Sequence, residues 1–271
     1  MGKAANELVP YMFLKRLLRR TPLYPMLRYS RLYAALFGRK ASAVHEKEVA
    51  LYRTFLDRPR LIFDIGAYDG HKTAAFLELA DQVVACEPDP FNFRRLRLRF
   101  RRWRGRVTLY RVAVSDRVGT GRFFVHHPGS AFNTLNPKWV GVLEEDGGAR
   151  WNEAIRFLPD DELKVVTTTL DELILTHGVP DFIKIDAEGS ERKVFDGLNR
   201  RVPCVSWECL LPEFEADLFY ILRKLMAMDP RTVFNVVHEE GLVFQEFVPH
   251  DALVRWLDGS PPFSFDVVAR T

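Results

Sequence analysis

The chain contains little cysteine. Its 271 residues include three cysteines, Cys86, Cys204 and Cys209, and none belongs to a C-x-x-C pair. So few cysteines cannot form the disulfide framework of a small secreted domain, and the missing pair argues against a zinc ribbon or a thiol redox centre. We therefore expect a protein of the cytoplasm.

Long apolar runs are also missing. A membrane-spanning helix needs about 20 consecutive apolar residues. The apolar runs of this chain are short, and its N-terminus has no signal-peptide core. We expect no segment to cross a membrane and any membrane contact to be peripheral, at the inner face.

Positive charge is concentrated near the N-terminus. Residues 1–40 hold nine Lys or Arg and one Glu, a net charge of +8, whereas the whole chain carries +3. Aromatic and aliphatic residues lie between the basic ones, and Pro22 and Pro25 divide the segment into two short helices. With a helix expected at 44–57, residues 1–58 form a basic helical appendage. It favours contact with an anionic membrane, or packing on the body of the protein.

Short apolar runs alternate with helical patterns in residues 59–271. This alternation is typical of parallel βαβ units with helices on both faces of one sheet. Two β-rich runs, 232–238 and 263–269, close the chain and favour an antiparallel last strand. We predict one α/β domain with a doubly wound, mostly parallel sheet. The expected parallel strands are Leu61–Asp64, Gln82–Glu87, Val107–Val114, Phe182–Asp186 and Val202–Glu208.

A long excursion separates the third and fourth of these runs. It contains an expected strand at Arg122–His126 and then loop with a short helix. Loops at the carboxyl ends of strands vary without harming the core, so we interpret residues 130–160 as an insertion that covers the substrate. The helix after it starts at a capping box, Thr169 to Glu172, and ends at Gly178.

The first strand runs into a glycine turn, D-I-G-A-Y-D-G at 64–70, directly before a helix. Such a turn lets the backbone pass close to a ligand, and the helix start presents free N–H groups. The G-x-G-x-x-G spacing is absent, which argues against a nicotinamide dehydrogenase. Glu87 ends the second strand, where a carboxylate accepts two ribose hydroxyls. With Val112–Asp116, these features predict S-adenosylmethionine (SAM) as the cofactor.

Further segments follow the order and spacing of one family. They are FDIGAYDG (63–70), ACEPDPFNF (85–93), VAVSD (112–116), TTTLDEL (167–173) and FIKIDAEGSE (182–191). In these segments the chain resembles the FkbM family of SAM-dependent methyltransferases. The resemblance implies a class I Rossmann-like methyltransferase fold and O-methylation of a hydroxyl, commonly on a sugar of a glycan, glycolipid or natural product.

The resemblance also implies which residues hold SAM. The glycine turn would line the methionine end, the second strand end would hold the ribose, and the third strand end would face adenine. In that order these residues are Asp64, Gly66, Tyr68 and Gly70, then Glu87, then Ala113, Val114 and Ser115.

Acidic residues gather where the fourth and fifth strands end. Lys184 and Asp186 share one face of the fourth strand, Glu188 opens the next helix, and Glu208 ends the fifth strand. Methyl transfer needs an aligned acceptor and a group that takes its proton. We therefore consider Asp186, Glu188 and Glu208 as catalytic candidates, with His127 as an alternative general base.

Two other roles are open for these residues. Asp186 and Glu208 are placed like the acids that hold Mg²⁺ in catechol-type O-methyltransferases, but no third ligand is evident, so a metal is not favoured. For Lys184 the sequence favours a structural ion-pair network with Asp186 and Glu191, because a buried ammonium needs a partner.

The segment Arg94–Arg106 holds eight arginines in thirteen positions. Phe93, Leu96, Phe100 and Trp103 recur at helical spacing, so the expected helix buries them and turns most arginines to solvent. Such a face binds phosphates in some proteins. It lacks the interleaved aromatic residues of a base-stacking surface, and nucleic acid is therefore an unfavoured partner.

These observations together predict an O-methyltransferase that acts on a small-molecule or glycan acceptor. Two alternatives remain. One is a SAM-binding module without catalysis that interacts through its basic arm, and the other is an RNA ribose methyltransferase that uses the arginine-rich helix. The sequence is also compatible with a homo-oligomer.

Overall fold

The structure is a computed structural model that describes residues 39–151, 154–157, 162–239 and 241–271. The chain divides into two compact units, Met1–His45 and Glu46–Thr271. Residues 1–38, which contain the two short helices predicted for the basic segment, lie outside the described residues. The second unit begins upstream of the boundary predicted after residue 58.

Helix α4 (Arg39–Arg53) explains this earlier start. Its last turns carry Tyr52 and lead to Phe55, both of which are buried. The Tyr52 ring lies edge-on to Phe76 at 4.8 Å, and the Phe55 ring lies edge-on to Phe182 at 5.9 Å. Residues 46–58 therefore pack as part of the domain rather than as part of an appendage.

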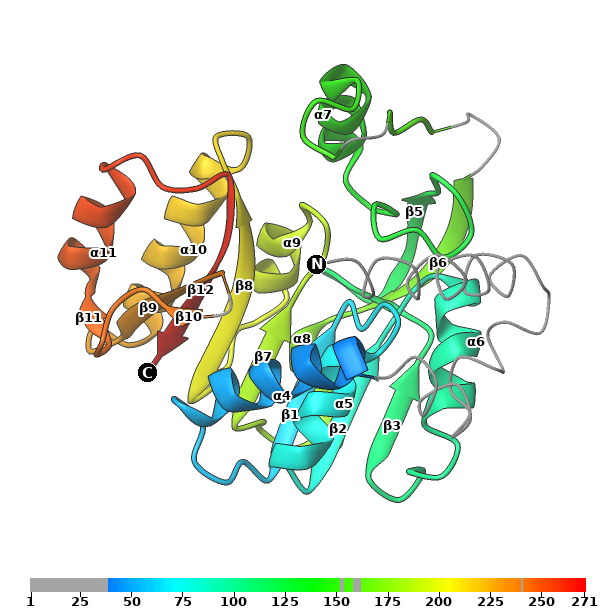
Figure 1. Ribbon diagram of the computed structural model, residues 1–271, viewed down its shortest axis with the longest axis horizontal. Coiled ribbons are helices and arrows are strands. Elements are labelled where there is room, and N and C mark those ends of the chain that lie inside the picture. Colours follow the sequence, from blue (N-terminus) through cyan, green and yellow to red (C-terminus); the bar gives the residue numbers. More distant parts are fainter. Residues whose placement is uncertain (1–38, 152–153, 158–161, 240) are drawn as a thin grey trace, which may run out of the picture. The chain divides into compact units, whose positions relative to one another are not determined.

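The main sheet has the strand order β10-β9-β12-β8-β7-β1-β2-β3 (Figure 1). Strands β3, β2, β1, β7 and β8 are mutually parallel, and β12 lies antiparallel between β8 and β9. This confirms the α/β fold with an antiparallel last strand. The bounds are β1 (Leu61–Ile65), β2 (Gln82–Cys86), β3 (Val107–Tyr110), β7 (Phe182–Ile185), β8 (Cys204–Leu210), β9 (Val233–His238), β10 (Gly241–Leu242), β11 (Val248–Pro249, paired with β9) and β12 (Ser264–Arg270).

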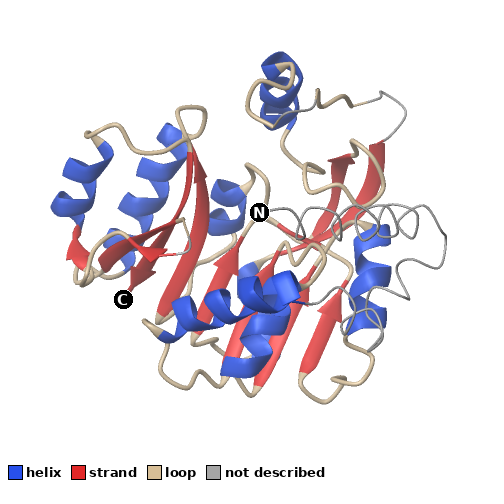
Figure 2. Cartoon of the chain, in the orientation of Figure 1, coloured by secondary structure: helices blue, strands red, loops and turns tan. Residues whose placement is uncertain are grey.

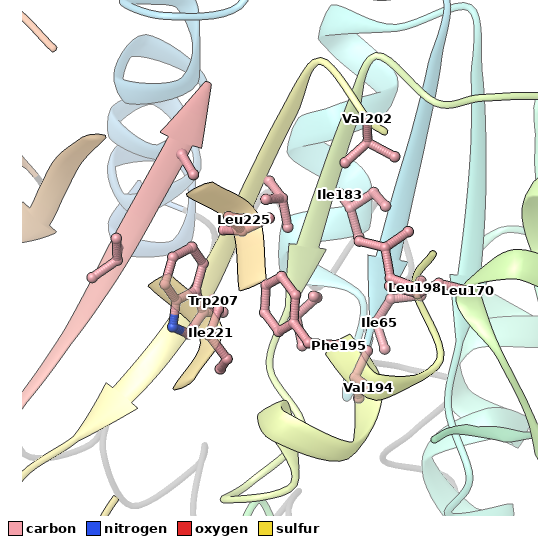
Figure 3. Close-up of a cluster of buried hydrophobic side chains, with 14 of the residues drawn as sticks. Ile65, Leu170, Ile183, Val194, Phe195, Leu198, Val202, Trp207, Ile221 and Leu225 are labelled. Atoms are coloured by element: carbon pink, nitrogen blue, oxygen red, sulfur yellow. The ribbon is translucent and has the colours of Figure 1, made fainter. Parts of the chain in front are cut away.

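Helices cover both faces of this sheet (Figure 2). Successive residues of a strand point to opposite faces, so Phe63 and Ile65 enter one core cluster and Ile62 enters the other. In Figure 3 Ile65 lies in the first cluster with Phe195 and Trp207. That face packs against α8 (Leu170–His177), α9 (Glu191–Asp196), α10 (Glu215–Met228) and α11 (His250–Leu257), and the other against α4, α5 (His71–Leu79) and α6 (Pro90–Arg99).

The predicted third strand is split between two sheets. Its first half is β3, at the edge of the main sheet, and its second half is β4 (Ala113–Val114). β4 joins β6 (Glu162–Thr168), which also pairs with β5 (Gly119–Phe124). Both halves bury apolar residues, so the apolar pattern alone does not mark the change of sheet.

Two helix predictions have different outcomes. The N-cap of the predicted capping box is present, since the Glu172 N–H donates to the Thr169 hydroxyl at 3.1 Å and α8 follows. The arginine-rich helix α6 ends at Arg99, however, and Trp103 is 45% exposed rather than buried. Among the described residues, we find no helix with the length and apolarity to span a bilayer.

Candidate functional site

A cavity of about 270 Å³ opens at the carboxyl ends of β1, β2 and β7. This is where ligands bind in open α/β sheets. The excursion contributes Asn133 and Thr134 to its wall. The cavity is also lined by predicted site residues, namely Gly66, Tyr68, Glu87, Ala113, Val114, Asp186 and Glu188.

The glycine turn brings the backbone against the end of β7. Gly66 has a φ of +80°, and a Cβ there would lie 1.7 Å from the Asp186 carbonyl oxygen. Gly70 also has a positive φ, but a Cβ there would meet the Leu96 side chain of α6. Gly66 therefore shapes the cavity, whereas Gly70 allows α5 and α6 to pack.

Asp64 lies beneath the turn rather than in the cavity wall. It is fully buried on β1, and its Oδ2 accepts a hydrogen bond from the Thr73 hydroxyl. Burial raises the pKa of this carboxyl. Its Oδ1 is buried and has no partner within the described part of the chain, so one strong acceptor beside the turn is left unsatisfied.

Glu87 is held with its carboxylate at the cavity. Its Oε2 accepts the Tyr68 N–H and its Oε1 accepts the Asp89 N–H, both at 2.8 Å. Each carboxylate oxygen has a second acceptor site, so the group can still accept two hydroxyl donors. Burial raises its pKa to about 8.

The wall beyond Glu87 is apolar. Ala113 and Val114 are buried and line the cavity, with Phe123 and Leu135 beside them. Ser115 does not share this wall. Its hydroxyl donates to Asp116 Oδ1 at 3.0 Å, and it borders a separate cavity on the small sheet.

Asp186 faces a lysine that the sequence analysis missed. Lys72, in the first turn of α5, places its Nζ 2.8 Å from Asp186 Oδ2. Lys184 Nζ lies 3.9 Å from the same oxygen. Burial opposes ionisation of Asp186, but the two lysines outweigh it and lower its pKa. The carboxyl is therefore an ion-pair partner and a poor proton acceptor.

The ion-pair network of Lys184 differs from the prediction. Its Nζ contacts Asp266 Oδ1 at 3.1 Å in addition to Asp186. Glu191 instead accepts the Ala187 N–H at 2.8 Å and fixes the start of α9. The network that braces the end of β7 is therefore completed by the last strand, β12.

The carboxyl groups of Asp186, Glu188 and Glu208 form a cluster of three. One oxygen of each carboxylate lies within 4.8 Å of the others. Burial, followed by the charges of Glu208 and Asp186, raises the pKa of Glu188 well above its usual range. The sequence analysis found no third metal ligand beside Asp186 and Glu208, and Glu188 is the acidic group that the structure adds to them. Because Lys72 and Lys184 already supply positive charge here, the cluster does not need a metal ion for charge balance.

The excursion is fixed over Glu188. The Thr134 hydroxyl donates to the Glu188 carbonyl at 2.7 Å, and Trp139 Nε1 donates to its carboxylate at 3.3 Å. Trp139 lies on α7 (Pro137–Asp146) and is fully buried. Asp89 ties the same loop to α6, since its Oδ2 accepts the Gly129 N–H at 2.9 Å.

His127 does not line the cavity. It is exposed, and its Nδ1 contacts the Pro128 carbonyl oxygen at 3.3 Å. Of the predicted site residues, those that the described cavity wall does not include are Asp64, Gly70, Ser115, Glu208 and His127.

We expect Glu208→Gln to raise the stability of the protein at alkaline pH. Burial and the neighbouring Asp186 raise the pKa of Glu208 to about 8. The folded protein favours the neutral form of Glu208. The contribution of this group to folding stability is therefore fully present below its pKa in the unfolded chain, and it is lost as the pH rises through about 8.

The check is thermal unfolding of both proteins from pH 5 to pH 9. The melting temperatures should converge at the acidic end and separate in favour of the variant at the alkaline end. Glu215→Gln, at an exposed position of α10, is the matched control and should show no such divergence. An equal difference at all pH values would contradict the assignment.

Residues 64–232 match the family model of the methyltransferase FkbM domain. The chain belongs to the FkbM methyltransferase family. SAM is the cofactor of this family. No curated protein sequence matches the chain significantly.

A solved structure of an FkbM methyltransferase shows the same fold. The crystal structure of methyltransferase FkbM from Methylobacillus flagellatus KT is similar at a TM-score of 0.52 and 16% identity, over 83% of this chain and 48% of that one. The O-methyltransferase from Bacillus cereus, in complex with SAH, matches at a TM-score of 0.40 and 13% identity, over 85% of this chain and 81% of that one. This chain spans about half the length of that FkbM methyltransferase.

The residues of the cavity fit SAM. Glu87 offers free acceptor sites for ribose hydroxyls, and the apolar wall at Ala113 and Val114 suits a purine ring. SAM supplies a methyl group on a positively charged sulfur, which needs no further activation. A protein that uses this methyl group has to hold an acceptor in line with it.

Proposed function

We propose that this protein transfers the methyl group of SAM to a hydroxyl, most consistently on a sugar of a glycan, glycolipid or natural product. Glu188 is the observation that carries the proposal. It lines the cavity, and burial together with Glu208 raises its pKa, which suits a group that accepts a hydroxyl proton.

The backbone at Glu188 supports a dedicated role. Its φ of 50° lies in the left-handed region, where a residue with a Cβ is strained. The Thr134 and Trp139 contacts hold it there from the excursion. The strained backbone of Glu188 is therefore held between the cavity and the excursion.

Lys72 and Asp186 suit the amino-acid end of SAM. This end carries an ammonium and a carboxylate. On the cavity wall, Lys72 offers a positive charge to the carboxylate and Asp186 offers a negative charge to the ammonium. Lys72 Nζ has three donors and uses one for Asp186. Its remaining donors are available to the carboxylate of SAM, while Asp186 accepts from the ammonium.

We expect Lys72→Met to weaken the binding of S-adenosylhomocysteine by about tenfold or more, because a charge-assisted hydrogen bond contributes about 1.5–3 kcal/mol. 5′-Methylthioadenosine lacks the amino-acid end, so its affinity should not change. Titration calorimetry with both ligands measures the difference. Lys224→Met, on α10, is the control; an equal loss for both ligands would mean that Lys72 only maintains the shape of the cavity.

The function is tested by incubating the full chain with SAM and a panel of hydroxyl acceptors. Nucleotide sugars and lipid-linked glycans are the first members, and mass spectrometry detects the added methyl group together with S-adenosylhomocysteine. The proposal predicts a product whose methyl group is on oxygen. Tight SAM binding without turnover on any acceptor would instead favour a SAM-binding module.

A further inference from the structure

Helix α6 and the turn after it carry arginines of two kinds. Arg99 donates to the Asp69 carbonyl at 2.8 Å, and Arg106 donates to the Leu77 and Ala80 carbonyls at 2.6 and 2.7 Å. Arg95 lies over the Tyr68 ring at 5.9 Å. These arginines attach the helix to the glycine turn and to the end of α5.

The other arginines face solvent. They have no hydrogen bond or ion pair to any described residue, and no Asp or Glu occurs in the segment 94–106 to neutralise them. After residue 40 the chain carries a net charge of −5, so this positive surface is a local exception. The solvent-facing arginines are Arg94, Arg97, Arg101, Arg102 and Arg104.

Large apolar side chains are exposed on the same surface. Phe91 and Leu98 are each 39% exposed, and Trp103 is 45% exposed. Arg94 follows Phe91 by three positions, and Leu98 follows Arg94 by four. The helical period therefore places all three on one face of α6. We call the solvent-facing arginines with Phe91, Leu98 and Trp103 the α6 surface.

The apolar character continues beyond the helix. A groove of about 170 Å³ lies between the start of α6 and strand β6. Pro88 and Pro90 line it from one side and Lys164 and Val166 from the other. Val166 is 53% exposed. Basic and apolar side chains therefore extend over two neighbouring elements.

We propose that the α6 surface binds an anionic phospholipid bilayer. Arginine guanidinium groups pair with lipid phosphates, while apolar stems and rings enter the interface between headgroups and acyl chains. Trp103 has the amphipathic ring that favours this depth. The inference does not depend on methyl transfer, because bilayer binding is measured without SAM or an acceptor.

The pattern favours a bilayer over RNA. RNA-binding surfaces stack bases on free aromatic rings. Here one exposed position is the aliphatic Leu98, and the Trp103 ring has the Arg106 guanidinium over it at 5.5 Å. Since Arg95 packs on Tyr68, the bound surface would also bring the SAM cavity near the membrane.

The test is co-sedimentation of the full chain with vesicles of phosphatidylglycerol and phosphatidylcholine, and of phosphatidylcholine alone. The wild type should bind the anionic vesicles only, and high salt should weaken binding. The triple variant Arg94→Glu, Arg97→Glu and Arg101→Glu should bind roughly a hundredfold less tightly, because each basic residue near an anionic leaflet contributes about fivefold. Unchanged melting temperature and SAM affinity establish that it is folded.

A second triple variant separates this surface from general charge and from the basic N-terminal arm. Arg200→Glu, Arg223→Glu and Arg255→Glu make the same charge change at exposed positions elsewhere and should keep most of the binding. Equal losses in both triple variants, or full binding by the α6 variant, would overturn the proposal. Binding of single-stranded RNA but not of vesicles, lost in the α6 variant, would also overturn it and assign the surface to nucleic acid.

Discussion

Replacing Glu87 with Ala is expected to weaken SAM binding by at least about a hundredfold. Above pH 8, where Glu87 is ionised, the substitution removes two charge-assisted hydrogen bonds to the ribose, and each contributes about 1.5–3 kcal/mol. Glu87 is well placed for both, because the Tyr68 and Asp89 N–H groups fix its two oxygens and leave one acceptor site on each. Calorimetric titration of the full chain with SAM measures the loss.

The ribose assignment needs a control, because Glu87 also supports the backbone of the glycine turn. Wild-type protein should bind adenosine more tightly than 2′,3′-dideoxyadenosine, whereas Glu87→Ala should bind both equally weakly. Glu215→Ala, at an exposed position, should behave as wild type. If the variant still prefers adenosine, Glu87 acts by shaping the turn and another group reads the ribose.

Local sequence signals identified the half of the site that lies within single loops. The glycine turn and Glu87 are each encoded by a few consecutive residues next to a strand, so their role follows from the motif and the topology of the sheet. The same holds for Thr169, whose hydroxyl caps the start of α8. Such features need no knowledge of which helix packs on which strand.

Contacts between distant segments were not predictable in this way. Lys72 meets Asp186 across 114 positions of the sequence, through the packing of α5 beside β7. Asp266 reaches Lys184 because β12 returns antiparallel beside β8. Lys72 lies in the first turn of an ordinary helix, and no local pattern in the sequence separates it from a solvated lysine.

The roles of the acidic residues also depend on their surroundings. Asp186, Glu188 and Glu208 were catalytic candidates because each lies at or just after the end of a strand. The lysines lower the pKa of Asp186, whereas burial and neighbouring carboxylates raise the pKa of Glu188 and Glu208. The strand-end positions predict that these three carboxyl groups gather, but the charges around each group decide which one accepts a proton.

Glu188→Gln is expected to reduce kcat by about a hundredfold to ten-thousandfold, the range for loss of a general base. SAM affinity should be nearly unchanged, because the lost proton transfer belongs to the transition state. Gln keeps the size of the side chain and an oxygen that accepts from Trp139. Steady-state rates with the acceptor found in the screen, and calorimetry with SAM, measure the two quantities separately.

Glu208→Gln provides the matched comparison and a test by pH. A general base works when ionised, so the rate of the wild type should rise with pH until Glu188 is deprotonated. Among the charges around Glu188, that of Glu208 raises its pKa most. Removing that charge lowers the pKa of Glu188, and the rising limb should therefore move to lower pH while kcat at its plateau is retained. A loss of kcat in Glu208→Gln as large as that in Glu188→Gln would show that Glu208 takes the proton instead.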